Sequence, residues 1–186
     1  MLLAERFARD GASVTLLLGP AGPARITGNR FRVIRFRFFD ELSRVLLAEL
    51  RRRPYDVVIH SAAVSDYRPV EVSRKKIPSD LRTWDIRLER TPKIIERIKA
   101  SAPGAILVGF KFEPRARPGV LIKEARALID SAQADLVVAN TVTRQGYRAC
   151  IVGRHADSCI LRDKRSMARR LVQMIGRGDG KDSRLW

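Results

Sequence analysis

Residues 55–76, YDVVIHSAAVSDYRPVEVSRKK, form the stretch of the chain that decides its fold. The apolar run 57–59 stops at the small residues 61–63, and an acid and an aromatic, Asp66 and Tyr67, follow at once. In open parallel sheets, ligands bind outside the carboxyl ends of the strands. A strand that ends in small residues lets a ligand approach the backbone. The stretch therefore predicts a buried strand leading into an active site, with the cations of 74–76 placed to close over phosphates.

Length and composition favour a single globular domain. The chain has 186 residues, of which 45% are hydrophobic and 31% are charged, as in ordinary folded proteins with a proper core. No apolar run approaches the roughly 20 residues that span a bilayer. The first residues carry acid early, which is typical of an amphipathic helix rather than a signal peptide. We therefore expect a cytoplasmic protein with no membrane partner.

The net charge of +17 favours polyanionic partners, either nucleic acid or phosphorylated small molecules. Basic residues occur along the whole chain, with runs at 51–53, 74–76 and 162–170. A nucleic-acid face interleaves cations with aromatics, and only 6% of the residues are aromatic. A solvated basic surface is the simpler interpretation, so nucleic acid is not the partner that we expect.

Helical and strand patterns alternate with short connections, which favours a parallel sheet. Periodicity and capping signals predict helices over residues 2–10, 40–53, 92–102, 119–131 and 163–175. Apolar or alternating runs predict strands over residues 13–18, 31–38, 55–63, 83–89, 105–112 and 134–142, then a hairpin of 149–152 with 158–161. We expect an α/β fold, a three-layer, Rossmann-like, mostly parallel sheet with a C-terminal hairpin and helix.

The pattern also predicts how the domain is organised. We expect one domain over residues 1–177 and a disordered tail over 178–186. Residues 64–82 show no period, and a loop of this length is more often functional than incidental, so we expect a mobile active-site loop. A doubly wound sheet opens with a strand and a glycine-rich turn before its first helix. Here that helix begins at residue 2, which predicts a domain truncated at its N-terminus.

Several common motifs are absent. Residues 19–30, GPAGPARITGNR, lack the spacing of a dinucleotide fingerprint or a P-loop. No tyrosine is followed four residues later by lysine, as a short-chain dehydrogenase requires, and no G-x-S-x-G elbow occurs. The two cysteines, Cys150 and Cys159, fit neither a metal pattern nor a disulfide framework. We therefore expect no protein-bound metal centre.

Five segments remain as candidates for the functional site. They are HSAAVSDYRP (60–69), RKKI (74–77), RTPKII (90–95), ILVGFKFE (106–113) and DLVVAN (135–140). In this order and spacing they resemble phosphopantothenate–cysteine ligase, which is also the C-terminal domain of the bacterial bifunctional coenzyme A biosynthesis flavoprotein. The resemblance covers roughly residues 2–142 and is strongest over 57–113.

The resemblance implies a reaction and its partners. Such enzymes use CTP or ATP to activate the carboxylate of 4′-phosphopantothenate as an acyl-nucleotide, which the amine of cysteine then attacks. Both larger substrates are polyanions, so cations and backbone amides must offset crowded negative charge, and Mg²⁺ usually bridges the phosphates. Family members are usually homodimers, in which the loop and an exposed strand, here 83–90, reach across the subunit interface.

The same resemblance assigns roles on the segment 62–76. Lys76 matches the catalytic lysine of the mobile loop, and Lys75 assists it. Asp66 lies near the ribose of the nucleotide or its metal ion. Ala62 and Ala63 are small so that the nucleotide can approach the backbone. The alternative for Lys76 is a solvated loop lysine.

Two further residues follow from the resemblance. Phe110 matches the position that packs beside the nucleotide base, and an aromatic of the core at a strand end is the alternative. Asn140 matches a residue on the phosphopantothenate side, and an amide that bonds a strand-end backbone group is the alternative.

Departures from the family pattern leave other functions open. The family's Asn-x-Ser-Ser-Gly segment does not precede residue 2, Pro78 and Ser79 replace lysines after Ile77, and residues 143–158 are arginine-rich. An inactive or truncated relative that binds only nucleotide or a partner is therefore one alternative. A basic nucleic-acid-binding protein is another.

Overall fold

The computed structural model describes residues 1–20, 31–73, 75–154 and 160–176, and the expected tail, 178–186, lies outside them. The central sheet has the strand order β3-β6-β7-β8. Neighbours pair in parallel except β7 and β8, which are antiparallel. Its strands are β3 (Val57–His60), β6 (Ile106–Phe112), β7 (Leu136–Thr143) and β8 (Gly146–Gly153). The first four residues of β6 and of β7 are all buried, as expected of apolar runs covered on both faces.

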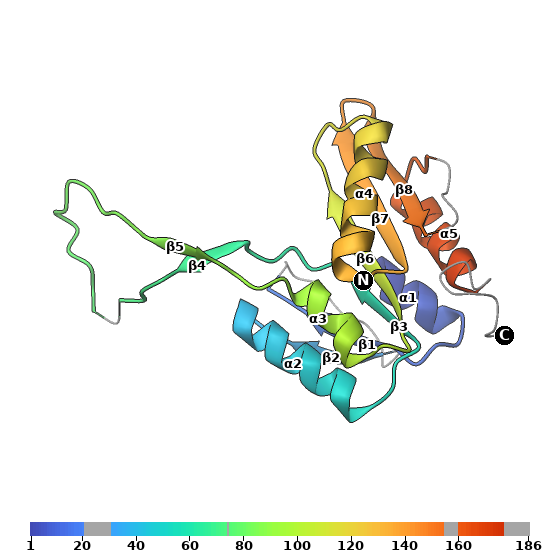
Figure 1. The fold of residues 1–186 in the computed structure, drawn as a ribbon, viewed down its shortest axis with the longest axis horizontal. Helices are drawn as coiled ribbons and strands as arrows, with labels where there is room; N and C mark the ends of the chain where they lie inside the picture. Colours follow the sequence, from blue (N-terminus) through green and yellow to red (C-terminus); the bar gives the residue numbers. More distant parts are fainter. Residues whose placement is uncertain (21–30, 74, 155–159, 177–186) are drawn as a thin grey trace.

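Helices cover both faces of this sheet and complete three layers (Figure 1). One face packs against α1 (Leu2–Arg9) and α5 (Lys164–Gly176). The other packs against α2 (Phe39–Arg52), α3 (Ile94–Ser101) and α4 (Pro118–Ala132). Each face buries its own apolar cluster, with Leu171 and Met174 in the first and Ile98 and Leu107 in the second. The predicted three-layer, mostly parallel α/β fold is confirmed.

A partly buried ion pair between Lys99 and Asp135 connects α3 to the sheet. The Asp135 carboxylate accepts hydrogen bonds from the Leu107 backbone N–H at 2.7 Å and from Lys99 Nζ at 2.5 Å. Lys99 Nζ also donates to the Ala105 carbonyl at 2.8 Å. Asp135 therefore joins the start of β7 to β6 and, through Lys99, to the last turn of α3.

A hairpin of β7 and β8 is present, which the sequence analysis does not predict. Eight residue pairs join β7 to β8, from Leu136 opposite Gly153 to Thr143 opposite Gly146. The turn is closed by Gly146, whose φ of +99° lies in the region that favours glycine. Of the expected second strand, 158–161, the structure describes residues 160 and 161, and Leu161 pairs with Ala149 in an isolated bridge. Residues 155–159 lie outside the described part of the chain.

A long arm projects from the body of the molecule (Figure 1). It starts at the antiparallel pair β4 (Tyr67–Pro69) and β5 (Leu88–Arg90) and continues through residues 70–87. The loop expected over 64–82 therefore contains a short strand, and the strand expected over 83–90 is confined to its last three residues. An ion pair of 2.8 Å between Arg68 and Glu89 holds the two strands together where the arm begins.

The first two strands form a separate sheet. β1 (Thr15–Leu18) pairs in parallel with β2 (Arg32–Arg35), and neither pairs with the central sheet. Among the described strands, β1 and β3 thus each have one edge without a partner. All four residues of each strand are only half-buried. The hydroxyl of Tyr55 lies 3.3 Å from Thr15 Oγ1, so the two sheets are close to each other. None of the described helices has the length and apolar character needed to cross a membrane.

Candidate functional site

A pocket of about 440 Å³ lies at the carboxyl ends of β3, β6 and β7, and we call it the candidate pocket. Five of the seven residues that the sequence predicts for the site line it, namely Ala62, Ala63, Asp66, Phe110 and Asn140. They come from segments far apart in the chain, which meet because parallel strands end at the same edge of the sheet. The other lining residues include His60, Thr91, Lys93 and Lys111.

Thr91 holds the wall of the pocket that carries Asp66. Its hydroxyl donates to the Ser65 carbonyl at 2.6 Å, and its backbone N–H donates to the Asp66 carbonyl at 3.0 Å. The sequence predicts a different role, with Thr91 capping a helix that starts at Pro92. The structure corrects this, because α3 starts at Ile94 and its cap residue, Lys93, makes no side-chain capping bond. Thr91 is therefore a positioning residue for the loop after β3.

Asn140 faces the candidate pocket with its amide free. Its carbonyl accepts the Glu113 backbone N–H at 3.0 Å, whereas its side chain has no hydrogen-bond partner among the described residues. The alternative interpretation, an amide that bonds a strand-end backbone group, is therefore not observed in the described part of the chain. A free amide at a pocket wall can both donate to and accept from a ligand.

Phe110 lies between the core and the candidate pocket. Its ring packs against the apolar cluster under α1 and α5, and the residue also lines the pocket. Gly109 beside it allows close packing, because a Cβ there would lie 3.1 Å from Ile95 and 3.2 Å from Leu128. Gly109 thus allows Ile95 of α3 and Leu128 of α4 to pack closely against β6.

His60 also lines the pocket, although the sequence analysis did not select it. Its Nε2 is buried and has no hydrogen-bond partner among the described residues. Burial lowers the pKa of the imidazole, so the ring is held neutral. A histidine directly before the small residues at a buried strand end is the sequence signal that identifies it.

The cations of the pocket differ in how they are paired. Lys111 Nζ lies 3.0 Å from Glu113 and 3.4 Å from Glu124, and the hydrogen bond with Glu113 raises its pKa. Lys93 precedes the first turn of α3, whose free backbone N–H groups are a favourable place for an anion. A charged ligand in the pocket would therefore meet one paired cation and one without an acid partner among the described residues.

Lys75 and Lys76 do not line the candidate pocket. Both are exposed on the arm, and the Lys75 backbone N–H bonds Ser73 Oγ at 3.2 Å. Figure 1 shows the arm leading away from the body of its own chain. The structure therefore does not bring the two predicted lysines together with the other five site residues.

Carboxylates are scarce around the pocket. Asp66 is the only one among the residues that line it. The described residues contain no group of three or more histidine, cysteine or acidic side chains that would hold a metal by protein ligands alone. Mg²⁺ is commonly held by one or two carboxylates together with substrate phosphates. Asp66 fits that pattern as the single protein carboxylate.

Comparison with known proteins gives consistent matches. The family model described as "DNA/pantothenate metabolism flavoprotein C-terminal domain" matches residues 1–177. A relative from Thermococcus kodakarensis, the coenzyme A biosynthesis bifunctional protein CoaBC, is 38% identical over 177 residues, which cover 93% of this chain and 43% of that protein. A phosphopantothenate–cysteine ligase from Mus musculus is 33% identical over 115 residues, which cover 60% of this chain and 36% of that protein.

The fold also matches a solved structure. The DNA/pantothenate metabolism flavoprotein from Streptococcus pneumoniae superposes with a TM-score of 0.82 at 25% identity, covering 94% of this chain and 85% of that one. The chain spans less than half the length of the two curated relatives above.

Proposed function

Since the chain belongs to the family of DNA/pantothenate metabolism flavoprotein C-terminal domains, we propose that it is a phosphopantothenate–cysteine ligase domain of coenzyme A biosynthesis. One observation carries the proposal. The candidate pocket gathers Ala62, Ala63, Asp66, Phe110 and Asn140 at the carboxyl edge of the sheet. In the proposed reaction, the carboxylate of 4′-phosphopantothenate attacks the α-phosphate of CTP or ATP and releases diphosphate, and the amine of cysteine then attacks the acyl carbon and displaces CMP or AMP to form an amide. We place this reaction in the cytoplasm.

The residues of the pocket suit these steps. Backbone at Ala62 and Ala63 lets the nucleotide approach the end of β3, beside Phe110. The side-chain amide of Asn140 binds the phosphopantothenate side. Asp66 is the pocket carboxylate that would hold Mg²⁺, and the ion would supply positive charge to offset the charge of the nucleotide phosphates.

We propose that the arm completes the pocket of a second copy of the chain. The arm carries Lys75 and Lys76 away from the pocket of its own chain. It also exposes large apolar side chains that a partner would cover, with Val72 exposed by 81% and Trp84 by 58%. In a homodimer, Lys76 of one chain would stabilise charge at the α-phosphate bound by the other.

We propose in addition that a strand fits between β1 and β3. β1 and β3 are both apolar strands with one parallel neighbour, and the other edge of each has no partner among the described strands. An inserted strand would join the two sheets into one doubly wound sheet and would lead its following turn toward the amino end of α1.

An activity assay tests the ligase proposal. The chain, alone and preceded by the residues encoded upstream, is incubated with phosphopantothenate, cysteine, Mg²⁺ and CTP or ATP, and amide product and diphosphate are measured. We expect Asn140→Ala and Asp66→Asn to lower kcat/KM by about a hundredfold, because each removes a group that contacts substrate. Val142→Ala and Asp56→Asn make similar changes outside the pocket and should keep full activity.

If neither the chain alone nor the chain with its upstream residues formed amide product or diphosphate, the ligase proposal would be overturned. Calorimetric binding of CTP or ATP without turnover would then favour the inactive relative that binds only nucleotide. If nucleic acid bound instead, with an affinity that falls linearly with salt on logarithmic axes, the chain would be a basic nucleic-acid-binding protein.

A further inference from the structure

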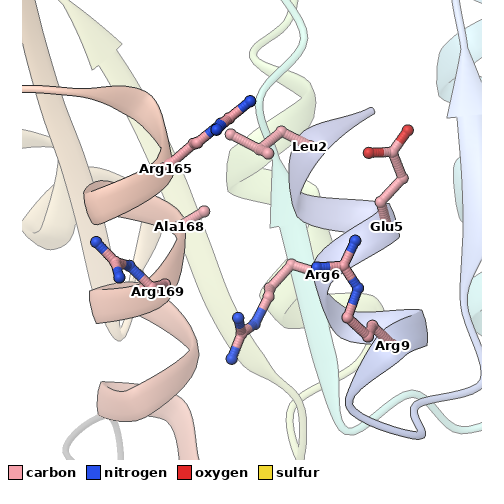
Figure 2. Close-up of a pocket in the computed structure, with 7 residues that line it drawn as sticks. All are labelled: Leu2, Glu5, Arg6, Arg9, Arg165, Ala168 and Arg169. Carbon is pink, nitrogen blue, oxygen red and sulfur yellow. The ribbon is translucent and has the colours of Figure 1, made fainter.

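A second hollow lies on the face of the sheet that α1 and α5 cover. It has a volume of about 590 Å³ and shares no lining residue with the candidate pocket. Figure 2 shows the two helices side by side, with Arg6 and Arg165 reaching from them toward the space between. We call it the arginine groove, and it is lined by Leu2, Glu5, Arg6, Arg9, Arg165, Ala168 and Arg169.

The groove holds more positive charge than its own acids offset. Four arginines and one acid, Glu5, line it. Arg6 is paired, because its Nε lies 2.9 Å from the Asp10 carboxylate. Arg9 and Arg165, one on each helix, have no side-chain partner among the described residues. Each helix therefore supplies an arginine whose fork of donors is available to a ligand.

The position of Arg165 points to an anion as well. It lies in the first turn of α5, where the helix dipole already places partial positive charge, so a cation there is unfavourable. The cap of this helix supplies one acid, Asp163, which accepts the Ser166 backbone N–H at 2.8 Å and its hydroxyl at 2.6 Å. An anion between the helices would offset both the arginines and the end of the helix.

The size and lining of the groove indicate the kind of anion. Its volume is that of a small-molecule site. A nucleic-acid surface uses aromatic side chains to stack bases, and no aromatic residue lines this groove. Guanidinium groups match phosphate geometry with paired hydrogen bonds, and two helices supply them from two sides. We propose that the arginine groove binds a diphosphate group, either as free inorganic diphosphate or as the diphosphate of a nucleotide.

Calorimetry in about 0.15 M salt, where long-range surface attraction is screened, tests the proposal. The probes are inorganic diphosphate and ADP. The double variant Arg9→Ala/Arg165→Ala should bind diphosphate at least about tenfold more weakly, because it removes two charge-assisted contacts. The control Arg44→Ala/Arg52→Ala removes the same charge from the exposed side of α2 and should bind like the wild type. Arg165→Lys keeps the charge without the fork and should bind at an intermediate level.

The two probes separate the two sources of the group. Tighter binding of ADP than of diphosphate, weakened by the groove variant, supports a nucleotide, and the reverse order supports free diphosphate. Equal weakening in the groove variant and in the α2 control would show general charge attraction and overturn the proposal. Binding that is lost in Asn140→Ala and kept in the groove variant would belong to the candidate pocket and overturn it too. If hexaglutamate bound as tightly as diphosphate and was weakened to the same extent by the groove variant, the proposed diphosphate ligand would be wrong and an acidic peptide would take its place.

Discussion

Asp135 is a charged side chain on which the packing of three elements depends. It is only 8% exposed, and it bonds both a backbone N–H of β6 and the ammonium group of Lys99. Removal of one partner from such a pair leaves the other charge poorly solvated, which costs far more than the net value of the pair.

We expect Asp135→Ala to lower the free energy of unfolding by about 3 kcal/mol, because Lys99 and the Leu107 N–H lose their partner. Urea denaturation followed by circular dichroism measures the change. Asp130→Ala removes an exposed acid from α4 and should stay within about 0.5 kcal/mol of the wild type. A loss no larger than that of the control would mean that Asp135 is not structurally important.

His60 makes stability depend on pH. Burial lowers its pKa from the ordinary value of 6.5 in the folded chain, so the unfolded chain binds more protons below that value. Stability should therefore be complete above about pH 6.5 and fall as the pH drops below it. His60→Gln should flatten the difference in unfolding free energy between pH 7.5 and pH 5, measured by urea titration. Equal slopes in the two proteins would contradict the prediction, since the remaining titrating groups are shared.

At the scale of elements, the sequence predicts whether a segment is a helix or a strand better than it predicts which strand it pairs with. Strong apolar runs such as 105–112 and 134–142 gave strands close to β6 and β7, because both are buried on two faces. The pairing of β8 with β7 was not predicted, since the Gln145-Gly146 turn signal was not weighed, whereas the predicted contact of 149–152 with 158–161 is seen in the bridge between Ala149 and Leu161. Alternation over 83–89 predicted a strand, but the arm provides no neighbouring strand for most of those residues to pair with.

The residues predicted for the candidate pocket also differ in how well their positions could be predicted. The five residues near strand ends are brought together, because parallel strands must end at one edge. The direction of the arm, and with it the place of Lys76, depends on tertiary contacts that no local pattern reports. His60 was missed because its significance depends on burial, although its place directly before the small residues at the end of a strand could have identified it.

The arm leads to a prediction about assembly. If its apolar side chains cover a second copy of the chain, Trp84→Glu should shift the protein from dimer to monomer by placing charge in the contact. Sedimentation equilibrium gives the mass of the species. Arg82→Glu changes a neighbouring polar position on the arm and should leave the assembly as it is. A wild-type monomer at micromolar concentration would contradict the proposed dimer and the shared site.

At the scale of the whole molecule, the separation of the two sheets bears on stability. The four-residue strands β1 and β3 are half-buried, whereas β6 is mostly buried. A strand between them would bury their apolar side chains further, at about 25 cal/mol for each Å² removed from water.

We therefore expect the chain preceded by its upstream residues to have a higher melting temperature than the present chain. Covering the two edges should also protect their backbone amides from hydrogen exchange. Scanning calorimetry and exchange measurements on both chains check this. Unchanged exchange in β1 and β3 would mean that the added residues do not enter the sheet.

The uncovered edges of β1 and β3 also make this chain suited to fragment complementation. A short synthetic peptide of apolar, β-branched residues, supplied in trans, would find hydrogen-bonding groups on both sides at once and register with each. Such a peptide would work as a switch, since its concentration would set the fraction of chains with a continuous sheet. If the proposed ligase activity increased when the peptide was added to the unchanged chain, the increase would show that the peptide joins the two sheets.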